Sequence, residues 1–170
     1  MALDWNAIEE EYKSDYKDYA PNGVYKTTLN GVELKQVGQK GNFIVKFQFE
    51  ETDDYKFPTA DHWIVKDKQN WRVKHMKDLM VVLGSSEENA KKACEIAESK
   101  DNFDYAIQGY EKAFTALAKK KPEVEIEISQ DGKYSRAEFT DRRVAMRNNK
   151  KEDVIASGEE IVLDTELPFN

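Results

Sequence analysis

The chain has 170 residues, of which 39% are hydrophobic and 35% charged, a composition typical of one folded domain with a solvated surface. Its 33 acidic and 26 basic residues give a formal net charge of −7, and taken as a mean this charge argues against binding a polyanion. The sequence contains no run of 18 apolar residues and no basic, apolar leader, so we expect neither a membrane span nor an export signal. The single cysteine, Cys94, has no partner for an internal disulfide, which favours a cytoplasmic protein.

The charges are unevenly distributed along the chain. Residues 1–18 hold six acids and two lysines, and residues 152–170 hold six acids and no base, whereas residues 19–151 hold 24 bases and 21 acids. The body is therefore mildly basic and both ends are acidic. Because residues 152–170 also lack a periodic apolar pattern, we expect them to form a disordered acidic C-terminal tail.

The first half of the chain predicts an arm and three strands. Apolar residues at helical spacing in residues 1–20 predict an N-terminal arm or short amphipathic helix laid on the body. Residues 24–35 predict a strand that bends at Asn30-Gly31, and residues 42–50 alternate apolar and polar side chains, as a half-buried strand does. A third, short strand is predicted at 62–65.

The apolar period then changes to that of helices. Residues 73–83 predict a helix that ends at Gly84. Ser85 with Glu88 is typical of a capping box for a second helix, and Asp101 is the expected cap of a third. Together they predict a helical insertion at about 70–121.

Two more strands follow, at 123–129 and 134–140, with further strand considered at 144–147. The fold class we predict is mainly β with a helical insertion, an OB-fold-like, five-stranded, partly open barrel with the helices between strands 3 and 4. That domain would span residues 21–151. A simpler α+β sheet with a helical layer is the alternative.

Residues suited to catalysis are few. His62 and His75 have no cysteine or carboxylate at metal-ligand spacing, and no Gly-rich phosphate loop or nucleophile motif occurs. The carboxylates of Glu123, Glu125 and Glu127 share one strand face, where they form either a solvated surface or a divalent-ion site. We therefore expect that the protein is not an enzyme and binds neither a metal nor a cofactor. A metal-dependent nuclease that uses these three glutamates is the least favoured alternative.

Basic and aromatic residues are better organised. Tyr134 and Arg136 lie two apart on one strand face, which would place a base-stacking ring beside a phosphate contact. Lys66, Lys68, Arg72 and Lys74 surround Trp71 in a second basic group. The candidates for binding single-stranded DNA are Lys26, Lys46, Trp63, Trp71, Arg72, Tyr134, Arg136, Arg142, Arg143 and Arg147.

The tail closes in Asp164-Thr165-Glu166-Leu167-Pro168-Phe169. With the strand-rich body, this ending resembles single-stranded-DNA-binding proteins of the bacterial and phage type. The resemblance implies sequence-independent coating of single-stranded DNA during phage replication or recombination, in the cytoplasm of a bacterial host. It also implies that an acidic tail recruits replication or recombination enzymes and competes with DNA, with Asp164 and Glu166 supplying charge and Leu167, Pro168 and Phe169 the apolar anchor. Because the family includes dimers and tetramers, the resemblance is compatible with a homo-oligomer and does not select an oligomeric state.

A reading from a different class remains beside it. Both acidic ends are also typical of a phage protein-interaction module or inhibitor that acts on a basic host protein. The net charge favours this reading, and the bases gathered between residues 133 and 151 disfavour it.

Overall fold

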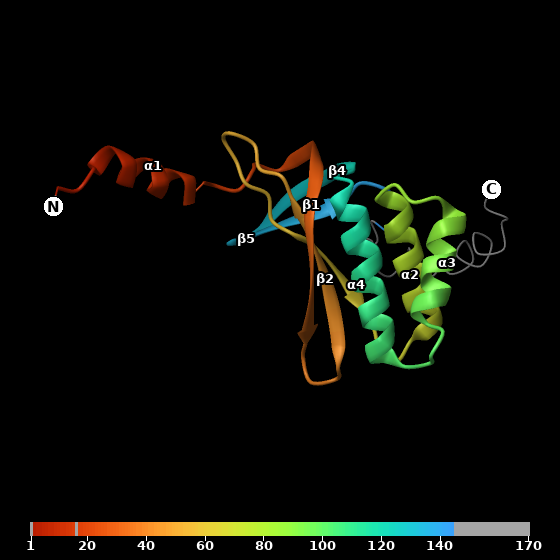
Figure 1. Ribbon diagram of the computed structural model, residues 1–170. Coiled ribbons are helices and arrows are strands. Elements are labelled where there is room, and N and C mark those ends of the chain that lie inside the picture. Colours follow the sequence, from red (N-terminus) through yellow and green to blue (C-terminus); the bar gives the residue numbers. More distant parts are fainter. Residues whose placement is uncertain (1, 16, 145–170) are drawn as a thin grey trace.

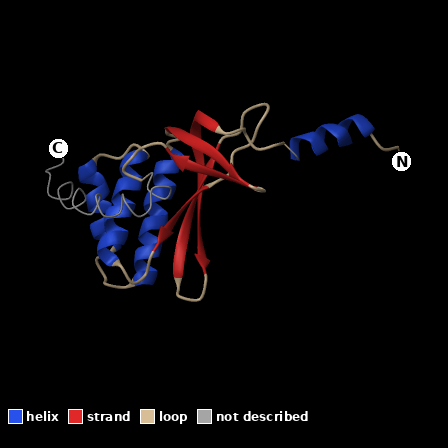
Figure 2. Cartoon of the chain, turned by 180° about the vertical axis from the view of Figure 1, so that it is seen from behind, coloured by secondary structure: helices blue, strands red, loops and turns tan. Residues whose placement is uncertain are grey.

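The computed structural model describes residues 2–15 and 17–144. Five antiparallel strands form one sheet in the order β3-β2-β1-β4-β5. Three of the four helices, α2, α3 and α4, lie together on one side of that sheet, as Figures 1 and 2 show. The strands are β1 Gly23–Val37, β2 Asn42–Phe49, β3 Ala60–Ile64, β4 Glu123–Asp131 and β5 Tyr134–Phe139. The helices are α1 Trp5–Asp15, α2 Gln69–Val82, α3 Glu87–Ala97 and α4 Phe103–Lys119.

The sheet has one buried face and one solvent face, set by the alternation within each strand. On β2, Val45 and Phe47 are fully buried, and residues paired with them across β1 and β3 share their face. On β4, Val124 and Ile126 are buried in the same way. The alternation predicted for 42–50 is confirmed, and so is the bend in the first strand, where the pairing shifts register between Leu29 and Gly31.

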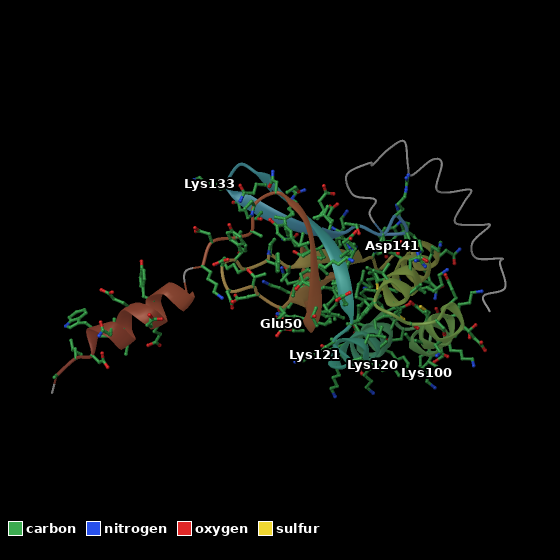
Figure 3. The ribbon with its side chains drawn as sticks, turned by 90° about the horizontal axis from the view of Figure 1, so that it is seen from above. Glu50, Lys100, Lys120, Lys121, Lys133 and Asp141 are labelled. Carbon is green, nitrogen blue, oxygen red and sulfur yellow. The ribbon has the colours of Figure 1, made fainter. Side chains whose placement is uncertain are left out.

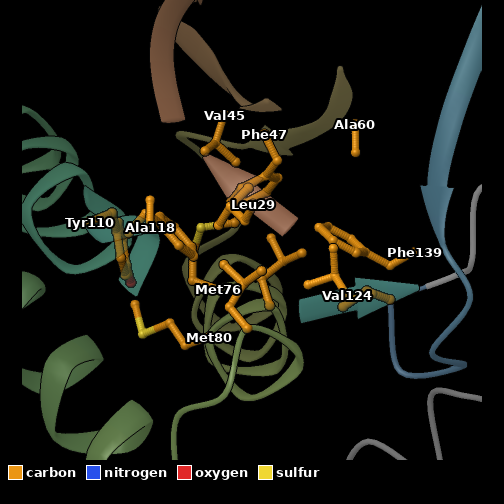
Figure 4. Close-up of a cluster of buried hydrophobic side chains, with 14 of the residues drawn as sticks. Leu29, Val45, Phe47, Ala60, Met76, Met80, Tyr110, Ala118, Val124 and Phe139 are labelled. Atoms are coloured by element: carbon orange, nitrogen blue, oxygen red, sulfur yellow. The ribbon is translucent and has the colours of Figure 1, made fainter. Parts of the chain in front are cut away.

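The core lies between the buried face and the helices, as Figure 4 shows. Phe47 stands at its centre, in edge-on contact with Phe114 of α4 and Phe139 of β5 at centroid distances of 5.3 and 5.5 Å. Met76 and Leu79 of α2 are fully buried in the same cluster. Among residues 2–15 and 17–144, this face is covered and the opposite face of the sheet is exposed.

The helical insertion occurs where it was predicted, but two of its caps differ. Ser86, not Ser85, caps α3, because its hydroxyl accepts a hydrogen bond from the Asn89 amide at 3.1 Å. Asn102, not Asp101, caps α4 in the same manner. The end of α2 at Gly84 is confirmed, and its φ of 106° lies in the left-handed region that glycine adopts without strain.

The N-terminal helix forms but does not lie on the body. In α1, Trp5 and Tyr12 are 65% and 62% exposed, and Figure 1 shows the helix projecting away from the sheet on the side opposite α2–α4. The expected amphipathic contact is therefore wrong. The apolar stripe of α1 has the helical period, but Trp5, Ile8 and Tyr12 stay exposed in the described part of the chain.

A sheet of five antiparallel strands with inserted helices agrees with the coarse fold predicted from the sequence. Among residues 2–15 and 17–144 the strands do not close into a hydrogen-bonded ring. Residue 144 belongs to a turn, so it does not continue the sheet as considered. In the same part of the chain, no helix combines the length and apolarity that crossing a bilayer demands.

Candidate nucleic-acid interface

Five candidate residues share the solvent face of the sheet. The strand registers place them there together, since each alternates along its strand with residues that point into the core or pairs with a residue that points away from it. They come from all strands except β4. The five are Lys26, Lys46, Trp63, Tyr134 and Arg136.

Trp63 is the centre of a cross-strand row on this face. It pairs with Ile44 of β2, which pairs in turn with Lys35 of β1. The indole is 42% exposed although it lies on a strand. We call these three residues the Trp63 row: one large flat ring, one apolar neighbour and one cation, at the spacing of adjacent strands, about 4.8 Å.

The end of the sheet beside the Trp63 row is basic. Lys40 is exposed in the turn that joins β1 and β2. Lys66, also exposed, lies against Gly41 of this turn, with its Cδ 3.5 Å from the position a Cβ would take there. Lys35, Lys40 and Lys66, which we call the basic end, therefore lie at the same end of the sheet as Trp63.

Sequence reasoning placed Lys66 in a basic group but did not select these three as a set. The signal for Lys35 was present, because it shares the polar face of its strand with Glu33 and alternates with Leu34. The sequence does not show the strand pairing that brings Lys35 and Trp63 into one row. The two residues lie on β1 and β3, which both pair with β2.

Lys46 lies in the next row, between two carboxylates. It pairs with Glu33 on one side and Asp61 on the other, and its Nζ is 3.1 Å from the Asp61 Oδ2. Its side chain keeps 25% of its exposure. Lys46 therefore forms an ion pair with Asp61, and a phosphate that bound Lys46 would have to compete with this carboxylate.

The β4 part of the solvent face is acidic. Glu123, Glu125 and Glu127 alternate along it, and Lys26 lies opposite Glu125 while Glu138 lies opposite Glu127. This row of carboxylates would repel a polyanion. Among residues 2–15 and 17–144, no group of three or more His, Cys, Asp or Glu residues is placed to hold a metal ion.

Arg72 is placed away from the sheet face, inside the helical layer. It is 4% exposed, and its guanidinium donates to the Glu98 carboxylate at 2.6 and 2.8 Å and to the carbonyl of Val65 at 2.8 Å. Tyr110 donates to the same carboxylate at 2.6 Å. Burial by itself would raise the pKa of Glu98, but the hydrogen bonds from Arg72, Tyr110 and Gln69 outweigh it and hold that pKa below its usual value. The structure therefore gives Arg72 a stabilising role, and we leave it out of the interface.

Trp71 also belongs to the helical side. Its ring stacks on His75 at a centroid distance of 4.9 Å. His75 Nε2 lies 3.1 Å from His62 Nδ1, and both imidazoles are buried, so this contact joins α2 to β3. The pairing of the two histidines was not foreseen from the sequence, because they come from different elements.

The remaining candidates follow β5. Arg143 is held by Asp141, which accepts from its Nε and Nη2 at 3.0 and 2.8 Å, while Arg142 is exposed in the same turn. Tyr134, 75% exposed, begins β5 directly after Lys133, which Figure 3 shows at the end of the sheet away from α2–α4. Arg147 and the tail residues Asp164, Glu166, Leu167, Pro168 and Phe169 lie outside the described residues.

Comparison with known proteins adds no relative to this picture: no protein-family model matches the chain, and neither the curated proteins nor the solved structures contain a significant match. The functional reading therefore depends on the arrangement of the residues themselves.

Proposed function

We propose that this protein binds single-stranded DNA, without sequence preference, through the β1–β2–β3 part of its solvent face. The observation that carries the proposal is the Trp63 row together with the basic end. A half-exposed indole at the same end of the sheet as three lysines offers a stacking surface for a base and contacts for the neighbouring phosphates.

The topology supports the same function. The order β3-β2-β1-β4-β5, with the helices between β3 and β4, is the connectivity expected of a partly open OB barrel. The two edge strands also approach each other, since His62 of β3 stacks on Phe139 of β5 at 5.9 Å. In OB folds the face of strands 2 and 3 binds oligonucleotides, and the solvent face of β2 and β3 in this protein carries Trp63, Ile44 and Lys46.

The solvent face favours single strands over a duplex. Stacking on Trp63 requires an unpaired base with an accessible ring face, which a duplex hides inside its base stack. The lysines alone would serve any polyanion. Trp63, which lies at the basic end of the sheet, is therefore the residue that would favour single-stranded DNA over a duplex.

The proposal extends to the tail on the strength of its sequence. An acidic segment with a Leu-Pro-Phe tip suits a docking site for basic, apolar pockets on replication or recombination enzymes. The same charges would compete with DNA for the basic end, and salt would weaken this competition because it screens exposed charges beyond about 10 Å at 0.1 M. The process served is then phage DNA replication or recombination.

Replacing the central ring tests the proposal. Trp63→Ala should raise the Kd for a single-stranded oligonucleotide about 5- to 100-fold, since one stacked base contributes about 1 to 3 kcal/mol. Trp71→Ala is the matched control, because Trp71 is 39% exposed but lies on α2. Fluorescence anisotropy with a labelled oligonucleotide measures both constants. Equal losses in the two variants, or none in either, would contradict a site centred on Trp63.

A further inference from the structure

The two edge strands of the sheet leave an open seam between them. β3 pairs with β2 alone and β5 with β4 alone, yet Cα atoms of β3 and β5 come within 8 Å of each other. A strand inserted between them would need about 9.6 Å, two strand spacings. Where the edges approach, the seam is therefore too narrow for an added strand, although the two edges share no ladder in the described residues.

A pocket of about 370 Å³ opens at this seam. This volume is near the lower end of the range of small-molecule sites, about 300 to 1,000 Å³, and suits one ring system and not a folded partner. We call it the seam pocket. Its lining includes Tyr19, Pro58, Asp61, Ser135, Arg136 and Glu138.

The charges around the seam pocket are balanced. Asp61 is paired with Lys46 and also accepts a hydrogen bond from Thr59 at 2.7 Å. Arg136 and Glu138 have opposite charge and lie two apart on one face of β5. A strongly charged group therefore gains little net attraction inside, whereas a neutral polar ring finds both donors and acceptors.

Two side chains provide specific contacts for such a ring. Tyr19 lines the seam pocket and is 43% exposed, and the Lys56 Nζ lies over one face of its ring at 4.6 Å from the centroid, so a base would stack on the other face. The Ser135 hydroxyl oxygen is buried and has no hydrogen-bond partner in the described part of the chain. A buried hydroxyl without a partner is unfavourable, and a ligand edge that reached it would remove this penalty.

We propose that the seam pocket receives one nucleobase of the bound strand, stacked on Tyr19 and hydrogen-bonded at its edge by Ser135, with Arg136 contacting the adjoining phosphate. This inference rests on the proposed function and extends its site. The seam pocket borders β3, whose solvent face carries Trp63, so a strand bound at the Trp63 row reaches the seam by crossing one strand edge.

Tyr19→Ala tests the inference against a ligand that has no bases. The Kd of this variant for a labelled single-stranded oligonucleotide of about 16 nucleotides should rise about 5- to 100-fold. Its affinity for inorganic polyphosphate, measured by competition, should stay within about twofold, because the substitution leaves every charge in place. Tyr105→Ala, at 39% exposure on α4, is the matched control and should change neither constant.

Ser135→Leu provides a second test, because the larger side chain fills the seam pocket while leaving Tyr19 intact. It should weaken oligonucleotide binding and spare polyphosphate, with thermal unfolding confirming that the variant is folded. If wild type binds the oligonucleotide but Tyr19→Ala binds it as tightly, the seam-pocket inference fails and the proposed function stands. The inference also fails if Tyr19→Ala weakens polyphosphate binding equally. If wild type binds no single strand, both fail.

Discussion

Replacing Lys35, Lys40 and Lys66 together by glutamine is expected to weaken single-stranded DNA binding on the order of 10- to 100-fold at low salt. Lys35 belongs to the Trp63 row, Lys40 and Lys66 lie at the same end of the sheet, and an exposed charge contact contributes up to about 1 kcal/mol. A single strand releases about 0.7 counterion per neutralised phosphate, so the slope of log K against log salt should become shallower by about 2. Titrations at several salt concentrations measure both quantities.

The control changes the same number of charges elsewhere. Lys92, Lys100 and Lys112 are exposed on the helical layer, and Figure 3 shows Lys100 remote from the β4–β5 hairpin. Replacing these three by glutamine should leave the salt slope within experimental error. If both triple variants lose affinity equally, binding follows the overall charge of the protein, and the basic end has no special role.

Arg72→Met is expected to lower the free energy of unfolding by about 3 to 5 kcal/mol, because it leaves the Glu98 carboxylate buried without its cation. The ion pair has an N–O distance of 2.6 Å, and both side chains are at most 10% exposed. The affinity of the folded variant for single-stranded DNA should be unchanged, since Arg72 lies inside the helical layer. Chemical unfolding and anisotropy measure the two effects.

The pH dependence of unfolding shows whether Glu98 causes this loss. In wild type the pKa of Glu98 is lowered, so its stabilisation is present above the usual glutamate value of about 4.3 and is lost as pH falls through the folded value. Without Arg72, burial dominates and raises that pKa, so protonation favours the folded variant. The difference in the free energy of unfolding between wild type and Arg72→Met should therefore become smaller as the pH falls from 7 to about 4. If this difference did not change with pH, the loss of stability in Arg72→Met would come from lost packing and not from the charge of Glu98.

Much of the local structure is readable from the sequence because it depends on neighbours along the chain. Strict alternation in residues 42–50 determines which face of β2 is buried, and Gly84 marks the end of α2. The caps were misplaced by one residue because Ser85-Ser86 and Asp101-Asn102 each offer two adjacent capping side chains. Only the backbone conformation decides between them.

The site is less readable because its residues meet through long-range pairing. Lys35 and Trp63 are 28 positions apart in sequence, and they join one row through β2. Arg72 belonged to a basic group in the sequence, yet Glu98, 26 residues later, holds it in the helical layer. A single charged residue does not reveal from sequence whether a partner elsewhere in the chain will bury it.

The competing readings predict different surfaces. A module that binds a basic protein would rely on acidic surface, and the glutamates of β4 provide some on the same sheet. A nuclease would need further carboxylates close to that row, and its cleavage would depend on added magnesium. Neither reading accounts for an exposed indole at the basic end of the sheet.

The fluorescence of Trp63 during a DNA titration tests the central claim most directly. In the Trp5→Phe/Trp71→Phe background Trp63 is the one remaining indole of the chain, so its emission reports on this position alone. A single-stranded oligonucleotide at low salt should quench it in a saturable manner, salt should reverse the quenching, and the matching duplex should quench it far less. An oligonucleotide that binds without changing Trp63 emission, or that fails to bind at low salt, would contradict the account.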